Sequence, residues 1–143
     1  LIAGPNLAYI TGGDFHLMER PTILIISKNF KPVAVLPNLE VDSFKALNFD
    51  AEIIPWKDSE GYNQAYEIAS NMIGDVKVIG VEGQRMRVFE LDIMKKAFPK
   101  WCFLNVYNHL LQSKKDQSPH FWLKLKMNKD LPYSRIWQEY ISH

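Results

Sequence analysis

The sequence predicts an α/β fold in which a mixed sheet carries helices on its faces. Two β-branched runs, Thr22–Ser27 and Pro32–Leu36, are separated only by "KNFK" and predict an antiparallel hairpin. After residue 50, strand and helix patterns alternate, which is typical of crossover units that join parallel strands. A hairpin followed by crossover units indicates a sheet with both antiparallel and parallel pairs.

The N-terminal stretch and the hairpin supply the first elements. The opening apolar residues and Thr22–Ser27 both have the character of buried strands, and Asn29 suits the turn of the hairpin. Residues 38–48 carry apolar side chains at helical spacing, so a short helix is expected there. The "AEII" run at 51–54 predicts a strand that ends at Pro55.

Ser59–Ile73 is the clearest predicted helix. Asp58 or Ser59 is expected to cap its start, and Gly74 its end. Its apolar residues follow a 3.6-residue period and form one face: Tyr62, Ala65, Tyr66, Ala69, Met72 and Ile73.

The second half continues the alternation. A strand is predicted over 76–81, an amphipathic helix closed by Pro99 follows it, and "WCFLNV" at 101–106 predicts a further strand. Beyond a polar linker at 112–119, residues 121–127 alternate like a strand. A short amphipathic helix is then expected, with its apolar residues at Tyr133, Ile136, Trp137, Tyr140 and Ile141.

Composition limits the class of protein. A chain of 143 residues with 47% apolar residues fits one domain with a real core. A formal net charge of +1 argues against a dedicated nucleic-acid binder, and no apolar run is long enough to cross a bilayer. A single cysteine fits a reducing compartment, so we expect a cytoplasmic protein with neither nucleic-acid nor membrane partners.

Motifs for catalysis are not found. The chain has no Gly-rich phosphate loop, no paired-cysteine zinc site and no HExxH, and its four histidines are scattered. Cys102 falls in an apolar strand and is expected to be a buried structural thiol rather than a nucleophile. From the residues alone, no metal site and no catalytic residue are predicted.

Several segments, taken in order, resemble the N-terminal domain of the creatinase/prolidase family, which includes Xaa-Pro dipeptidases and aminopeptidases P. "GPNLAYITGG" is similar to that family's P-x-N-x-x-Y-L-T-G segment. "ERPTILIISKNFKPVAVLPNLEVD" resembles its hairpin with P-x-L-E, and "VIGVEG" its IGVE strand. "AFP" before "WCFLNV" and the linker-like "LLQSKKD" follow in the family's order.

The resemblance implies a ribonuclease H-like, three-layer α/β/α fold for residues 1–116. Family members begin with a helix and half a strand before the position of Leu1, so these are expected to be missing, and "PNLAYITG" is expected to be a turn. Residues 117–143 do not resemble the family and form an extension of uncertain role.

The implied function is that of a non-catalytic domain of a Xaa-Pro peptidase-like metallohydrolase. Such a domain acts in homodimerisation and closes the substrate pocket of a C-terminal catalytic domain that binds two divalent metal ions (Mn, Zn or Co). The partners are then that catalytic domain, a second subunit and a proline-containing peptide. This chain alone is expected to be inactive. The alternative is a stand-alone peptide- or protein-binding scaffold on the same fold.

The resemblance also implies that Phe15, His16, Glu19 and Arg20 contribute to the substrate pocket. Arg20 either binds a substrate carboxylate or forms a salt bridge to Glu19 or Asp14. Phe15 is either a pocket wall or a core residue, and His16 is either an active-site neighbour or a surface residue. Trp56 could lie in an interface, whereas Tyr62 and Tyr66 are expected in the core.

Overall fold

The computed structural model describes residues 1–16, 19–74 and 76–105. Within them the strands are β1 (Ile23–Ile25), β2 (Val33–Pro37), β3 (Glu52–Trp56), β4 (Val78–Val81) and β5 (Cys102–Asn105). The helices are α1 (Pro5–Thr11), α2 (Val41–Ala46), α3 (Asn63–Ile73) and α4 (Val88–Ala97), with a 3-10 turn η1 at Asn38–Glu40. The extension predicted over 117–143, with its strand and helix, lies outside the described residues.

The sheet is mixed, as the sequence predicts. β1 pairs antiparallel with β2, and β2 pairs parallel with β3, which gives the order β1-β2-β3. β4 and β5 form a separate parallel pair. The antiparallel pair is the predicted hairpin, and the parallel pairs follow from the crossover helices α2 and α4.

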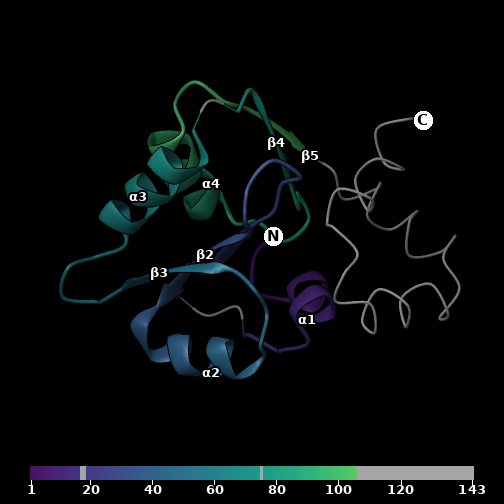
Figure 1. Cartoon of the computed structure of the whole chain (residues 1–143). Helices are drawn as coiled ribbons and strands as arrows, with labels where there is room; N and C mark the ends of the chain where they lie inside the picture. The colour runs from purple at the N-terminus through teal and green to yellow at the C-terminus, as the bar shows by residue number, and fades with distance from the viewer. Residues whose placement is uncertain (17–18, 75, 106–143) are drawn as a thin grey trace, which may run out of the picture.

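Helices cover both faces of the three-stranded sheet, so the fold has three layers (Figure 1). On the α3/α4 side, residues such as Val35, Trp56 and Tyr66 form one buried cluster. On the α1/α2 side, residues such as Leu36 and Phe44 form a second cluster. These two apolar layers confirm the predicted α/β/α class.

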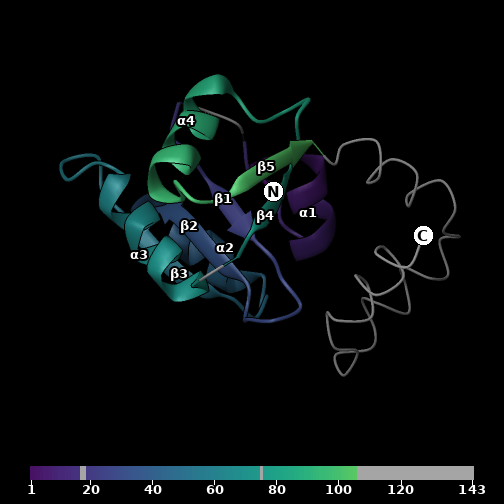
Figure 2. The same cartoon turned by 90° about the horizontal axis from the view of Figure 1, so that it is seen from above.

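The N-terminal residues join the two sheets (Figure 2). Ile2 forms an antiparallel bridge with Ile23, and the Leu24 amide donates to the Leu1 carbonyl at 2.9 Å. On its other side, the Ile2 amide donates at 2.9 Å to a carboxylate oxygen of Glu82, just after β4. Asn6 donates its side-chain amide to the second oxygen of this buried carboxylate. Glu82 therefore ties α1 and the N-terminal strand segment to β4.

The predicted turn at "PNLAYITG" is wrong, because Pro5–Thr11 forms helix α1. Proline suits the first turn of a helix, where its missing N–H costs nothing. Gly12 ends the helix with φ at 83°, and its amide donates to the Ala8 carbonyl at 2.8 Å. The run is short and mostly apolar, so its period did not reveal a helix.

Two boundaries also differ from prediction. Pro55 lies inside β3 instead of ending it, which an edge strand permits. Helix α3 begins at Asn63, later than expected, and no side chain caps it. Its predicted end is confirmed, since Gly74 adopts φ of 71° and its amide donates to the Ser70 carbonyl at 3.2 Å.

Candidate functional site

The predicted site residues fall into two environments. Glu19 and Arg20 lie together at the entry to β1, whereas Phe15 is buried and His16 is exposed. Phe15 is 6% exposed, and its ring centroid lies 5.8 Å from that of Phe44 in the α1/α2-side cluster. In this arrangement Phe15 is a core residue that presents little surface to a ligand.

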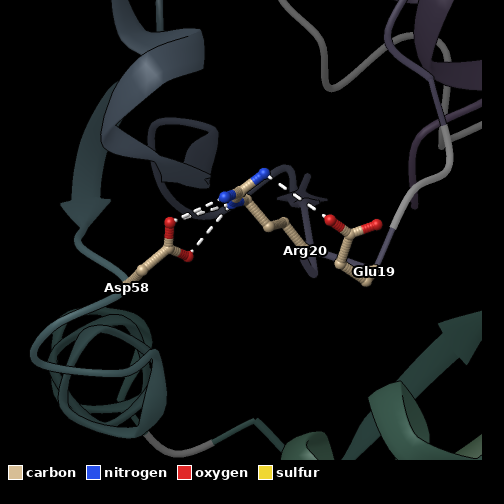
Figure 3. A network of polar contacts seen from close by, with 3 residues as sticks. All are labelled: Glu19, Arg20 and Asp58. Atoms are coloured by element: carbon tan, nitrogen blue, oxygen red, sulfur yellow. Dashed lines mark hydrogen bonds and ion pairs between the residues drawn. The ribbon is translucent and has the colours of Figure 1, made fainter.

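The guanidinium of Arg20 binds the carboxylate of Asp58 (Figure 3). Its Nε donates to Oδ1 of Asp58 at 3.0 Å and to Oδ2 at 3.1 Å, and Nη2 donates to Oδ2 at 2.8 Å. Nη1 lies 3.7 Å from a carboxylate oxygen of Glu19 on the other side. The guanidinium thus has a bidentate carboxylate on one edge and a second carboxylate near the other.

The backbone on both sides of this ion pair is anchored. Arg20 is followed by the buried Pro21, whose carbonyl accepts the indole N–H of Trp56 at 3.3 Å. Trp56 ends β3, and Asp58 comes two residues later. The start of β1 and the end of β3 are therefore held together, which places the two charged side chains at one edge of the sheet.

The ion pair shifts both pKa values. The hydrogen bonds and charge of Asp58 raise the pKa of the Arg20 guanidinium above its usual range. The hydrogen bonds from Arg20 lower the pKa of the Asp58 carboxyl, against a smaller opposing effect of desolvation. Side chains of both remain accessible, at 36% and 60%. The arrangement can bind a carboxylate at the protein surface.

Sequence reasoning weighed Glu19 and Asp14 as the partners of Arg20 and missed the dominant one. Asp58 had been expected at the start of a helix, where an acidic residue is common. The pairing depends on the β1-β2-β3 strand order, which brings the start of β1 near the end of β3. Only a prediction of that order could have identified it.

The aromatic residues singled out in the sequence lie in the core. Trp56 is buried and packs edge-on against Tyr62, with ring centroids 5.6 Å apart, so it belongs to the core rather than to an exposed interface. Tyr66 is fully buried and Tyr62 partly so.

The prediction of a buried Cys102 is wrong: its side chain is exposed, because its position in β5 points to the uncovered face of that strand pair.

Within residues 1–16, 19–74 and 76–105, no group of three or more His, Cys, Asp or Glu side chains is placed to hold a metal ion. The described part of the chain therefore does not fit a metal centre, and no catalytic step is assigned to it. The same residues include no helix with the length and apolar character to cross a membrane.

Comparison with known proteins agrees with the fold. Residues 1–110 match the family described as "Creatinase/Prolidase N-terminal domain". Because this match covers most of the chain, the protein belongs to the creatinase/prolidase N-terminal domain family. No curated protein sequence gave a significant match.

Solved structures show the same fold. A proline dipeptidase from Streptococcus pneumoniae is similar with a TM-score of 0.68 and 22% identity, over 78% of this chain and 82% of that one. The Creatinase/Prolidase N-terminal domain of an X-Pro dipeptidase from Streptococcus pyogenes gives 0.64 and 20%, over 75% and 79%. A recombinant prolidase from Thermococcus sibiricus gives 0.64 and 21%, over 73% of this chain but 28% of that one.

Proposed function

We propose that this chain is the non-catalytic N-terminal domain of a Xaa-Pro peptidase-like metallohydrolase. Family membership supports the class, and the similar structures include dipeptidases and a prolidase. In the Thermococcus prolidase the matched region is 28% of the chain, so most of that protein lies beyond the matched domain. Two divalent ions in a separate catalytic domain would supply Lewis-acid and water-activating chemistry.

The role that we propose for this domain is to close the substrate pocket and to place Arg20 there. This proposal is supported by the bidentate ion pair between Arg20 and the exposed Asp58 carboxylate. A planar guanidinium of this kind binds any carboxylate in the same geometry, including the C-terminus of a dipeptide. Asp58 then occupies, within the chain, the position that a substrate carboxylate would take.

The test uses the full-length protein, in which, under this proposal, the catalytic domain follows these residues. Hydrolysis of Ala-Pro and of its C-terminal amide is measured with manganese for the wild type and for Arg20→Ala. Loss of a charge-assisted hydrogen bond should lower kcat/KM on Ala-Pro by about 10- to 100-fold. The amide lacks the carboxylate, so its hydrolysis should change little.

The matched control is Asp58→Ala, which removes the same ion pair but keeps the guanidinium. If Arg20 acts only through this pair, both variants will lower activity equally on both substrates, and the proposal fails. If Arg20 binds the substrate, Asp58→Ala will keep or improve the KM for Ala-Pro. This chain without the catalytic domain should not hydrolyse Ala-Pro with manganese, zinc or cobalt, and hydrolysis would contradict its non-catalytic role.

We also propose that the domain takes part in homodimerisation. Sedimentation equilibrium of the chain over a wide concentration range tests this part separately. Self-association that reaches a dimer is the expected result, and a strict monomer at the highest concentration would count against it.

A further inference from the structure

The turn at residues 57–61 connects β3 to α3, and its first four residues are exposed: Lys57, Asp58, Ser59 and Glu60. Across residues 1–16, 19–74 and 76–105, the bonds between Arg20 and Asp58 are the only hydrogen bonds or ion pairs that join this turn to residues outside it. Within that part of the chain, one exposed ion pair is therefore the polar attachment of the whole turn (Figure 3).

The turn also holds its own shape. The Glu60 and Gly61 amides both donate to the Lys57 carbonyl, at 3.1 and 2.9 Å. Gly61 has φ of 72°, a conformation that glycine adopts without strain. These backbone bonds do not involve Arg20, so the turn keeps its shape when the ion pair opens.

The base of the turn is anchored separately. Trp56, the last residue of β3, is buried and donates its indole N–H to the Pro21 carbonyl at 3.3 Å. On the other side of the turn, Tyr62 packs edge-on against the Trp56 ring, with centroids 5.6 Å apart. Because Arg20 directly precedes Pro21, the same contact holds the backbone beside the guanidinium. Loss of the ion pair therefore frees the tip of the turn and leaves its base and Arg20 in place.

We propose that this turn is a latch, in which Asp58 occupies Arg20 until the carboxylate of a peptide replaces it and the turn moves away. This role rests on the proposed binding of a substrate carboxylate by Arg20. Asp58 occupies the Nε–Nη2 edge of the guanidinium, and a carboxylate oxygen of Glu19 lies 3.7 Å from Nη1. Because Glu19 repels a further anion near Nη1, a ligand carboxylate takes the edge that Asp58 holds.

The ion pair is weak enough for this exchange. Both side chains are accessible to water, and an exposed ion pair shifts the balance between paired and open forms by at most about fivefold. A ligand that binds only the open form loses affinity by a similar factor. Asp58 therefore lowers the affinity for a peptide carboxylate by a small factor, and the position of the turn reports whether the carboxylate is bound.

The first test measures the KM of the full-length protein for Ala-Pro and for its C-terminal amide. Asp58→Asn removes the charge that competes for Arg20, so the KM for Ala-Pro should fall by about two- to fivefold while that for the amide stays the same. Glu60→Gln is the matched control, because it removes a charge from the same turn and keeps the bonds between Arg20 and Asp58. Both of its KM values should equal those of the wild type.

Failure of the latch can be separated from failure of the proposed function. An unchanged KM for Ala-Pro in Asp58→Asn overturns the latch, even where Arg20→Ala weakens hydrolysis of Ala-Pro alone and the substrate role of Arg20 is upheld. Equal losses on both substrates in Arg20→Ala remove the substrate role itself, and the latch with it.

The second test needs no catalytic domain and follows the turn in the 143-residue chain. The heteronuclear ¹⁵N NOE of the Ser59 and Gly61 amides should decrease in both Asp58→Asn and Arg20→Gln, because the tip of the turn is released. The amides of Trp56 and Tyr62 should keep their wild-type values, as should the whole turn in Glu60→Gln. Circular dichroism confirms that each variant is folded. Equal NOE values at Ser59 and Gly61 in the wild type and in both variants overturn the proposal.

Discussion

The guanidinium of Arg20 and the carboxylate of Asp58 connect two loops that are 38 residues apart in sequence. The Nη2–Oδ2 distance of 2.8 Å and the Nε–Oδ1 distance of 3.0 Å define a two-pronged contact rather than a loose surface pair. Because one loop precedes β1 and the other follows β3, this contact fixes the edge of the sheet where the proposed pocket contribution lies.

The pKa of Asp58 is the first prediction. Hydrogen bonds from Arg20 lower this pKa, so the stabilisation is fully present above the unfolded-state value of about 3.9 and is lost as pH falls through the lower folded-state value. The carboxyl carbon of Asp58, followed by NMR against pH, should titrate with a midpoint below the unfolded-state value. In Arg20→Gln its midpoint should rise toward 3.9, and an unchanged midpoint would show that the ion pair does not form in solution.

Phe15 and His16 should respond differently to truncation. Phe15→Ala removes a ring that is packed on Phe44 and should cost about 3–5 kcal/mol of unfolding free energy. His16 is exposed, so His16→Ala should change stability by less than about 0.5 kcal/mol. Urea denaturation measures both. A small loss for Phe15→Ala would favour the pocket-wall interpretation of this residue.

Glu82 should be needed for the attachment of α1. Its carboxylate is 1% exposed and accepts hydrogen bonds from the Ile2 amide and the Asn6 side chain. Glu82→Ala removes the carboxylate that accepts both of these hydrogen bonds and should destabilise the chain by about 2–4 kcal/mol. Glu82→Gln retains one acceptor oxygen and should cost less. Hydrogen exchange at the Ile2 and Leu24 amides should rise in the alanine variant, and unchanged exchange would contradict this role.

Tyr66 offers a test of an unsatisfied polar group. Its ring is fully buried, and its hydroxyl has no hydrogen-bond partner among the described residues. Burial and the nearby Glu90 raise the pKa of this hydroxyl, so it stays neutral at ordinary pH. Tyr66→Phe should therefore keep or slightly raise the melting temperature, whereas Tyr66→Leu should lower it through lost ring packing. A clear loss of stability in the phenylalanine variant would reveal a buried water or a partner for the hydroxyl.

The sequence was most informative where local patterns determine structure. The hairpin follows from two β-branched runs, and helix α3 from its apolar stripe and Gly74. The family could also be recognised, because several modest motifs occur in the family's order and the match to residues 1–110 confirms them.

Tertiary placement was harder to predict. Helix α1 has only seven residues, and most of them are apolar. Such a short stretch does not show a helical period clearly enough to distinguish a helix from a turn. The partner of Arg20 depends on which strands are neighbours, and no local pattern contains that information. The exposure of Cys102 likewise depends on which layer covers β5, not on the apolar residues beside it.

Pro55 limits the ability of β3 to pair with a strand from another copy of the chain. The Glu52 amide donates to the Pro32 carbonyl at 2.7 Å, so in a parallel pair the amides of Ile54 and Trp56 also point toward β2, while position 55 faces the open edge of β3. A proline there removes one of the amide donors that this edge would offer to an incoming strand and leaves that of Ile53. β3 is thereby guarded against edge-to-edge aggregation, a protection that a valine at position 55 would remove.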